Sequence, residues 1–288
     1  MYLFKEIARL QEALEQEKTA GRRIGFVPTM GALHEGHLSL IRAAKAATDV
    51  VVCSIFVNPT QFNDPKDFEK YPVTIKEDIL KLTGGGTNIL FLPSVAEMYP
   101  EGVNGRQPHY DFGYLETVLE GAHRPNHFQG VGIIVHKLLQ AVQPDDLFMG
   151  QKDFQQCMII KRLLEITQIP SKLHICPTLR EKDGLAMSSR NMRLDPAARQ
   201  IATRISQALG YVKENIRSLP FNIIKENASK QLQDAGYQVD YIEIADASDL
   251  QLLKEPVDRN MVVLAAAKLG EVRLIDNMII ASPGHAGS

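Results

Sequence analysis

The sequence has few cysteines, no long apolar run and no excess of charge of either sign. Three of its 288 residues are cysteines, and the widely spaced set of Cys53, Cys157 and Cys176 argues against a disulfide framework or a zinc ribbon. No apolar run approaches the ~20 residues of a membrane-spanning helix. Residues 1–18 are charged throughout and lack the apolar core of a signal peptide. We therefore expect a cytoplasmic protein that has no membrane partner.

The charge balance argues against a nucleic-acid partner held by bulk electrostatics. Lys and Arg total 32 against 34 Asp and Glu, which gives a formal net charge of −2, whereas nucleic-acid-binding domains usually carry a basic excess. Hydrophobic residues make up 44 % and charged residues 23 %, as in ordinary globular proteins, which excludes a disordered or fibrous chain. The length suits two domains or one larger domain.

Strand and helix patterns alternate over the first ~180 residues, which predicts an α/β domain with a mostly parallel sheet. An opening amphipathic helix is expected from the apolar spacing of Phe4, Ile7, Leu10 and Leu14. Further helices are expected at 36–47, 75–82, 131–142 and 153–166. Strands are expected at 24–27, 50–57, 89–92, 147–149 and 173–176.

The pattern changes between Pro177 and Asp195. Two helices are expected after this point, at 196–217 and 221–235, followed by strands at 239–244, 261–267 and 272–280. This order predicts a smaller α+β unit with antiparallel strands. We therefore predict two domains, residues 1–178 and 179–288.

The strongest motif is Pro28-Thr-Met-Gly-Ala-Leu-His-Glu-Gly-His37, between the first long strand and the next helix. His34 and His37 fall in the first helical turn, where exposed N–H groups and the helix dipole favour an anion. Gly31 and Gly36 allow close approach of the backbone to a ligand. These features predict a phosphate site. A zinc-protease helix would need histidines four residues apart, which this motif lacks. The alternative without a function is a pair of surface histidines near a glycine turn.

Two further segments suit phosphate oxygens. Met187-Ser-Ser-Arg190 offers hydroxyls and a guanidinium in a loop. Taken alone, this segment is equally consistent with an ordinary loop that precedes a helix. Lys152 follows Gly150 at the carboxyl end of a strand, the edge at which parallel sheets bind ligands. Asp153 suits either a site residue or a helix N-cap.

Neutral amides form the last candidate group. Asn58 and Gln61 follow the apolar strand at 50–57, and Gln156 lies one helical turn beyond Lys152. Amides can recognise hydroxyl and carbonyl groups in a dry pocket without an unpaired charge. An isolated glutamine such as Gln156 is otherwise most often solvated at the surface.

In this order and at these separations the segments resemble the pantoate–β-alanine ligase (pantothenate synthetase) family, which belongs to the nucleotidylyl-transferase superfamily with a His-x-Gly-His motif. Gly121-Ala-His-Arg-Pro-Asn-His-Phe-Gln-Gly130 is similar to that family as well. The resemblance spans the whole chain. It implies a Rossmann-like domain, a C-terminal lid domain and a homodimer. It also implies ATP with Mg²⁺, pantoate and β-alanine as substrates, and pantothenate, AMP and pyrophosphate as products.

The resemblance also implies residue roles. His37 is the expected proton donor, and His34 and Lys152 join it as expected catalytic residues that stabilise phosphate charge. Gln61 and Gln156 are expected to bind pantoate, and Gln61 also to meet β-alanine. Asn58 is expected to bind substrate because of its position after the apolar strand, apart from the resemblance. No metal ligand is assigned. The expected ATP contacts are Met30, Gly31, Ala32, Leu33, His34, Glu35, Gly36, His37, Gly150, Gln151, Lys152, Asp153, Leu179, Met187, Ser188, Ser189 and Arg190.

Two other functions compete with this interpretation. A different transferase of the same superfamily would move AMP or CMP to a phosphate-bearing acceptor, and it should lack the glutamine pair and the large C-terminal unit. A non-catalytic nucleotide-binding regulator is the second alternative, against which the retention of Lys152 and both histidines argues. Release of AMP that depends on pantoate distinguishes all three.

Overall fold

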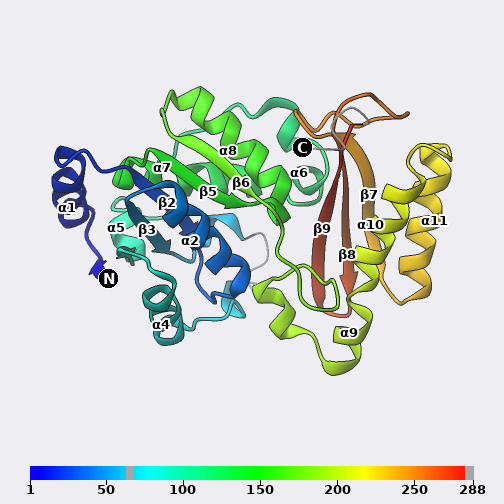
Figure 1. Ribbon diagram of the computed structural model, residues 1–288, viewed down its shortest axis with the longest axis horizontal. Coiled ribbons are helices and arrows are strands. Elements are labelled where there is room, and N and C mark those ends of the chain that lie inside the picture. Colours follow the sequence, from blue (N-terminus) through cyan, green and yellow to red (C-terminus); the bar gives the residue numbers. More distant parts are fainter. Residues whose placement is uncertain (63–67, 283–288) are drawn as a thin grey trace. The chain divides into compact units, whose positions relative to one another are not determined.

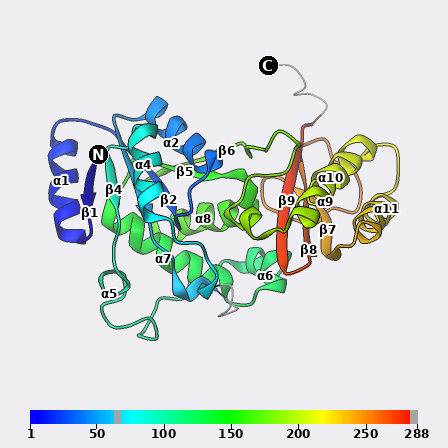
Figure 2. The same cartoon turned by 90° about the horizontal axis from the view of Figure 1, so that it is seen from below.

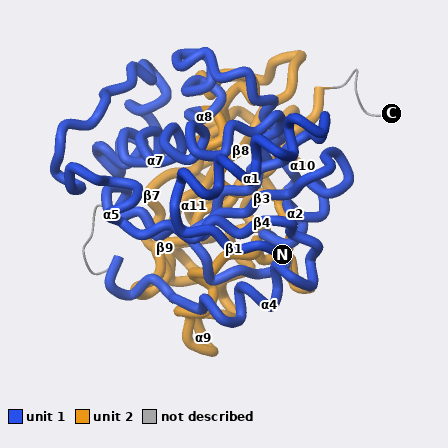
Figure 3. The backbone as a smooth tube through the Cα atoms, turned by 90° about the vertical axis from the view of Figure 1, so that its left-hand side faces the viewer, with its two compact units in different colours: residues 1–151, 159–177 blue, residues 152–158, 178–288 orange. Residues whose placement is uncertain are grey.

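The computed structural model describes residues 1–62 and 68–282 and divides the chain into two compact units, which Figure 3 distinguishes by colour. Unit 1 is Met1–Gln151 with Ile159–Pro177, and unit 2 is Lys152–Met158 with Thr178–Ser288. Unit 2 therefore takes in a short segment from the middle of the chain, which contains the candidate residues Lys152 and Gln156.

Unit 1 is built on a six-stranded parallel sheet in the order β1-β4-β3-β2-β5-β6. Figure 1 labels four of these strands, β2, β3, β5 and β6. The strands are β1 Tyr2–Phe4, β2 Ile24–Thr29, β3 Val50–Ile55, β4 Ile89–Phe91, β5 Asp146–Gly150 and β6 Lys172–Cys176. Every residue of β3 is buried, as expected for an apolar strand that is covered on both faces. The predicted mostly parallel α/β sheet is confirmed.

Helices connect the strands of this sheet. They are α1 Ile7–Thr19, α2 Glu35–Ala47, α4 Ile75–Gly85, α5 Val95–Met98, α6 Glu120–His123, α7 His127–Val142 and α8 Phe154–Thr167. Short 3₁₀ turns lie at η1 Pro59–Gln61, η2 Gly113–Glu116 and η3 Gln151–Asp153. Leu40 and Ile41 of α2 and Leu82 of α4 share one apolar cluster with β2 and β3. This packing holds the start of α2 against the carboxyl end of the sheet.

Several predicted boundaries differ from the structure, among them those of the opening helix, of α7 and of the helix predicted at 196–217. Phe4 lies in β1 and not on the opening helix, because it pairs with Phe91 of β4 at the edge of the sheet. Figure 2 shows β1 beside β4. Helix α7 begins at His127, four residues before the predicted start at Val131. Gly130 and Gly132 lower the helix propensity of the first two turns of α7. Glycine is nevertheless needed at position 130, since a Cβ atom there would lie 2.4 Å from the Thr60 carbonyl oxygen. The helix predicted at 196–217 is interrupted at Ala202 and Thr203, which separate two helices.

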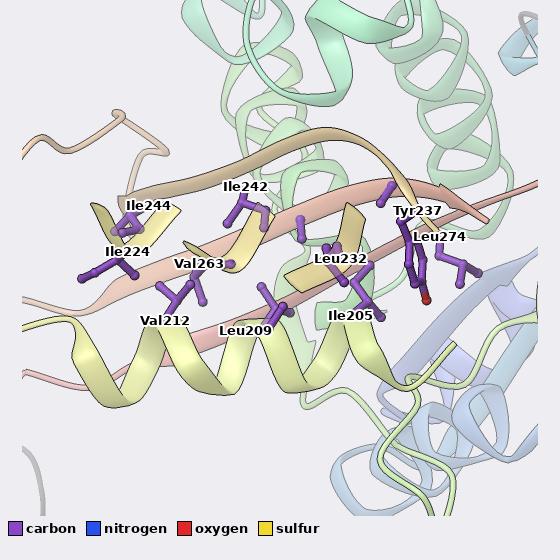
Figure 4. Close-up of a cluster of buried hydrophobic side chains, with 14 of the residues drawn as sticks. Ile205, Leu209, Val212, Ile224, Leu232, Tyr237, Ile242, Ile244, Val263 and Leu274 are labelled. Atoms are coloured by element: carbon purple, nitrogen blue, oxygen red, sulfur yellow. The ribbon is translucent and has the colours of Figure 1, made fainter. Parts of the chain in front are cut away.

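Unit 2 contains an antiparallel three-stranded sheet in the order β7-β8-β9. Its elements are η4 Ser189–Arg193, α9 Pro196–Ile201, α10 Arg204–Asn215, α11 Phe221–Asp234, β7 Gln238–Asp246, β8 Met261–Leu269 and β9 Val272–Ile280. Figure 4 shows Leu209 and Val212 of α10 packed against Val263 and Ile242 of the sheet. The predicted antiparallel unit is therefore confirmed, with its own apolar core.

Candidate active site

The two histidines of the His-x-Gly-His motif lie at the start of α2 and form a reciprocal cap. His34 is the N-cap residue, and its Nδ1 accepts the Gly36 N–H at 3.2 Å, while His37 Nδ1 accepts the His34 N–H at 3.3 Å. The ring centroids are 4.0 Å apart. Because an Nδ1 atom that accepts carries no proton, these hydrogen bonds assign the proton of each neutral ring to Nε2. The pair therefore presents Nε2–H donors at a helix N-terminus.

The turn before these histidines is held by a buried carboxylate that sequence analysis did not select. Asp78 of α4 accepts the N–H groups of Ala32 and Leu33 at 2.9 and 2.8 Å, and Lys81 Nζ donates to the Leu33 carbonyl at 2.6 Å. Ala32 has a φ of +49°, a conformation that non-glycine residues rarely adopt. Asp78 shares the apolar face of α4 with Ile75, and this placement is the sequence signal that marks it.

Gly31 shows how tightly this turn is packed. Its φ is +85°, and a Cβ atom there would lie 3.1 Å from Ile55 Cγ2 and 3.2 Å from Asp78 Oδ2. Both the backbone conformation and the close contacts therefore favour glycine at this position.

Gln61 lies beside the same turn, so the structure brings together candidates from two separate motifs. Gln61 Nε2 donates to Met30 Sδ at 2.9 Å, and the Gln61 carbonyl oxygen is 2.8 Å from His127 Nδ1. Arg124 Nη2 donates to the same carbonyl at 3.4 Å. His127 and Arg124 lie in the Gly121–Gly130 segment, for which sequence analysis had no specific role. They fix the main chain of η1 at the glutamine.

Asn58 is 1 % exposed, and its amide is engaged within the protein. Its Nδ2 donates to the Gly130 carbonyl at 3.1 Å and to Gln61 Oε1 at 3.3 Å. Its Oδ1 accepts from Tyr99 Oη at 2.7 Å and from the Thr60 hydroxyl at 3.2 Å. This set of partners suits a residue that holds η1 and the Gln61 side chain in place.

The candidate residues around Lys152 lie between the end of β5 and the start of α8. Gly150 ends β5 and Gln151 begins η3. In unit 2, Lys152 Nζ is 3.6 Å from Asp153 Oδ1, and the half-buried Gln156 lies in the first turn of α8.

Leu179 and Met187 are brought together, since the Met187 N–H donates to the Leu179 carbonyl at 3.0 Å. Ser188 caps η4 by accepting the Arg190 N–H at 3.3 Å, and Ser189 is buried.

Thiol chemistry is disfavoured where the thiols are buried. Burial raises the pKa of the Cys53 thiol to about 12 and also raises the pKa of Cys176, and only a thiolate is an effective nucleophile.

Within residues 1–62 and 68–282, no three His, Cys, Asp or Glu side chains gather as a metal site. No helix in the described part of the chain is long and apolar enough to cross a membrane.

A parallel sheet with paired histidines at the turn between β2 and α2, next to a buried amide network, has the features of a nucleotide-binding α/β enzyme. The family model of pantoate-β-alanine ligase matches residues 2–279, and the chain belongs to this family. It is therefore an enzyme of the ligase class.

Relatives match along the whole chain. A pantothenate synthetase of Cytophaga hutchinsonii is 43 % identical over 284 residues, which are 97 % of this chain and 99 % of that protein. One from Vibrio parahaemolyticus is 44 % identical over 294 residues, 100 % of this chain and 97 % of the relative.

Solved structures of the family are also similar. Pantothenate synthetase from Thermus thermophilus superposes with a TM-score of 0.91 at 36 % identity, covering 98 % of this chain and 100 % of the other. The pantoate-β-alanine ligase from Francisella tularensis, complexed with beta-gamma ATP and β-alanine, has a TM-score of 0.81 at 36 % identity and covers 97 % of both chains.

Proposed function

We propose that the enzyme joins pantoate to β-alanine, with conversion of ATP to AMP and pyrophosphate, through a pantoyl-adenylate intermediate. The observation that carries this proposal is the contact between Gln61 Nε2 and Met30 Sδ at 2.9 Å. It sets the candidate pantoate residue against the candidate ATP turn, at the sheet edge where parallel folds bind ligands. An acid bound at Gln61 would then lie next to a phosphate bound at His34 and His37.

In the first step a carboxylate oxygen of pantoate attacks the α-phosphorus of ATP. The bond to the β-phosphate oxygen breaks, and pyrophosphate leaves with that electron pair. Negative charge builds on the phosphate oxygens, and the Nε2–H groups of His34 and His37 are the donors proposed to stabilise it. Lys152 and the Met187–Arg190 loop, including Ser188 and Ser189, supply further donors to ATP.

In the second step the amine of β-alanine attacks the activated acyl carbon, AMP leaves with the electron pair of the acyl–phosphate bond, and the amide nitrogen releases a proton to solvent. Gln61 and Gln156 hold pantoate through its hydroxyl and carboxyl groups. Gln61 also meets β-alanine, because the amine must reach the same carbonyl carbon. The role proposed for Asn58 is support of Gln61 through their 3.3 Å hydrogen bond. Catalysis then rests mainly on positioning and electrostatics.

ATP is proposed to bind with Mg²⁺. Mg²⁺ typically uses one or two carboxylates together with substrate phosphates, and it rarely occupies a cage built only by the protein. Such a cation would neutralise phosphate charge.

We also propose that residues 179–288 form a lid domain and that two chains form a homodimer in the cytoplasm. Support for the lid comes from chemistry, since an acyl phosphate hydrolyses readily and closure excludes water. The family resemblance supports the dimer, and light scattering on the purified protein tests it.

Analysis of the products tests the proposed function. With ATP, pantoate and β-alanine, the enzyme should release AMP and pyrophosphate in equal amounts, and omission of pantoate should abolish AMP release. Formation of ADP and free phosphate would contradict the assignment. Transfer of AMP to a phosphate-bearing acceptor would support the alternative transferase, and absence of turnover would support a regulator.

A further inference from the structure

Strand β9 carries two neighbouring polar residues, Asp276 and Asn277, on opposite faces of the sheet. Val272, Leu274 and Ile280 of β9 belong to the apolar core of unit 2, and Figure 4 shows Leu274 among the packed side chains. Because side chains alternate along a strand, Asp276 projects to the same face as Leu274. Its side chain is 0 % exposed. A carboxylate in this environment requires a charged partner and hydrogen bonds.

Arg180 is that partner. Its guanidinium donates to both Asp276 oxygens, at 2.7 and 2.9 Å, in a bidentate pair. The same group donates to the carbonyls of Gly184 at 3.0 Å and Asn277 at 3.2 Å. The Arg180 side chain therefore joins β9 both to its own position in the chain and to Gly184.

This segment is a short hairpin that leads directly into the candidate ATP loop. The Glu181 N–H donates to the Leu185 carbonyl at 2.8 Å, and the Met187 N–H donates to the Leu179 carbonyl at 3.0 Å. Asn191 Nδ2 donates to the Ala186 carbonyl at 3.0 Å, which fixes the far end of the loop as well. Arg180 thus anchors the base of the hairpin that presents residues 187–190.

On the other face of β9, Asn277 contacts the second candidate ATP segment. Its Nδ2 donates to the Lys152 carbonyl at 2.9 Å. Its main-chain N–H donates to Asp276 Oδ1 at 2.7 Å, so the two neighbours are joined to each other. Lys152 and the hairpin that leads into Met187–Arg190 are distant in sequence, yet both are attached to two adjacent residues of one strand.

We infer that Asp276 and Asn277 are positioning residues for ATP, which set the placement of Lys152 relative to the Met187–Arg190 loop. Neither needs to touch the nucleotide. This inference rests on the proposed function, because it assigns phosphate contacts to both segments. A misplacement of about 1 Å at a reacting centre can cost ~10²-fold in rate, so the attachment has a kinetic consequence distinct from folding.

The substitution Asn277→Asp tests the attachment of Lys152 to β9, since it keeps the shape of the side chain but removes the N–H donor to the Lys152 carbonyl. We expect the KM for ATP to rise about tenfold and kcat to fall, with the KM for pantoate unchanged. Asn215→Asp is the matched control, because Asn215 Nδ2 donates to the Tyr211 carbonyl at 2.9 Å elsewhere in unit 2. It should leave the constants for ATP unchanged. Equal ATP constants in both variants would overturn the role of Asn277.

The double substitution Arg180→Met with Asp276→Leu tests the attachment of the 179–187 hairpin to β9. Apolar replacement of a buried ion pair often preserves stability, so a purely structural pair would leave ATP kinetics intact. We expect a higher KM for ATP and faster hydrogen exchange of the Met187 amide. The control replaces the pair of Asp240 and Arg273, whose side chains are 2.6 Å apart and half-buried in the same sheet, by Leu and Met. Normal ATP constants and normal exchange in the first double variant would refute the inference.

Hydrogen exchange separates this inference from the proposed function, because it needs no turnover. If the wild-type enzyme released no AMP, the proposed function would fail. Faster exchange at Met187 in the double variant would still support the attachment, and unchanged exchange would refute it. Should the double variant not fold, Asn277→Asp provides the same test through exchange of the amides at 152–155.

Discussion

Asp78 Oδ2 accepts the main-chain N–H of Ala32 at 2.9 Å, although the two residues are 46 positions apart. This hydrogen bond and its neighbour at Leu33 hold the turn that leads into the paired histidines. The conformation of the candidate phosphate site therefore depends on a carboxylate of another helix.

Asp78→Asn should lower the free energy of unfolding by about 2 kcal/mol, since hydrogen bonds to a charged group contribute ~1.5–3 kcal/mol. It should also raise the KM for ATP. Asp145→Asn is the control, because Asp145 Oδ2 accepts the Ile24 N–H at 2.7 Å at the opposite end of β2. Urea unfolding and ATP kinetics check the pair. A normal KM for ATP in Asp78→Asn would show that the turn does not need this carboxylate.

His37→Ala and Lys152→Ala should each lower kcat by ~10²–10³, the usual cost of removing a preorganised donor to a developing negative charge. The melting temperature should change far less, because neither residue belongs to the buried core. Steady-state kinetics and thermal unfolding measure the two effects. Near-normal turnover in either folded variant would remove that residue from the mechanism.

Gln61→Ala and Asn58→Ala should differ in stability although both reduce activity. Gln61→Ala should raise the KM for pantoate and leave the melting temperature almost unchanged. Asn58→Ala should lower the free energy of unfolding by about 2–3 kcal/mol, because the Tyr99 hydroxyl and the Gly130 carbonyl lose a buried partner. If Asn58→Ala kept full stability and changed only the KM for pantoate, Asn58 would be a direct substrate ligand.

Asp146 should make stability depend on pH in the acid range. Burial raises the pKa of this carboxyl, but hydrogen bonds from His174 at 2.7 Å and Arg23 at 2.5 Å outweigh that effect and lower the pKa overall. A carboxyl whose pKa is lower in the folded state than in the unfolded state stabilises the fold. This stabilisation is complete at pH values above the unfolded-state pKa of about 4, and it is lost as the pH falls through the folded-state pKa.

The wild-type enzyme should therefore exceed Asp146→Asn by about 2 kcal/mol at pH 7, and the difference should shrink towards pH 3. Urea unfolding at both pH values measures it. A difference that is equal at pH 7 and pH 3 would show that ionisation of Asp146 contributes nothing.

The features that sequence analysis predicted are those whose signals are local. The position of the histidine turn follows from a strand pattern, a glycine and a helix pattern that are adjacent in sequence. Gln61 was selected as a candidate because it lies a few residues after an apolar run that predicts a strand. Asp78 and Asn277 were not selected, because their partners, Ala32 and Lys152, are 46 and 125 positions away. Phe4 was misassigned for the same reason, since β1 exists only through its pairing with β4.

Exchange of labelled pyrophosphate into ATP in the absence of β-alanine tests the central claim most directly, because it isolates formation of the pantoyl adenylate. The wild-type enzyme should catalyse this exchange when pantoate is present and should stop when pantoate is omitted, and Gln61→Ala should weaken it. Exchange that requires β-alanine, or that proceeds without pantoate, would contradict a separate adenylation step at the His34–His37 turn.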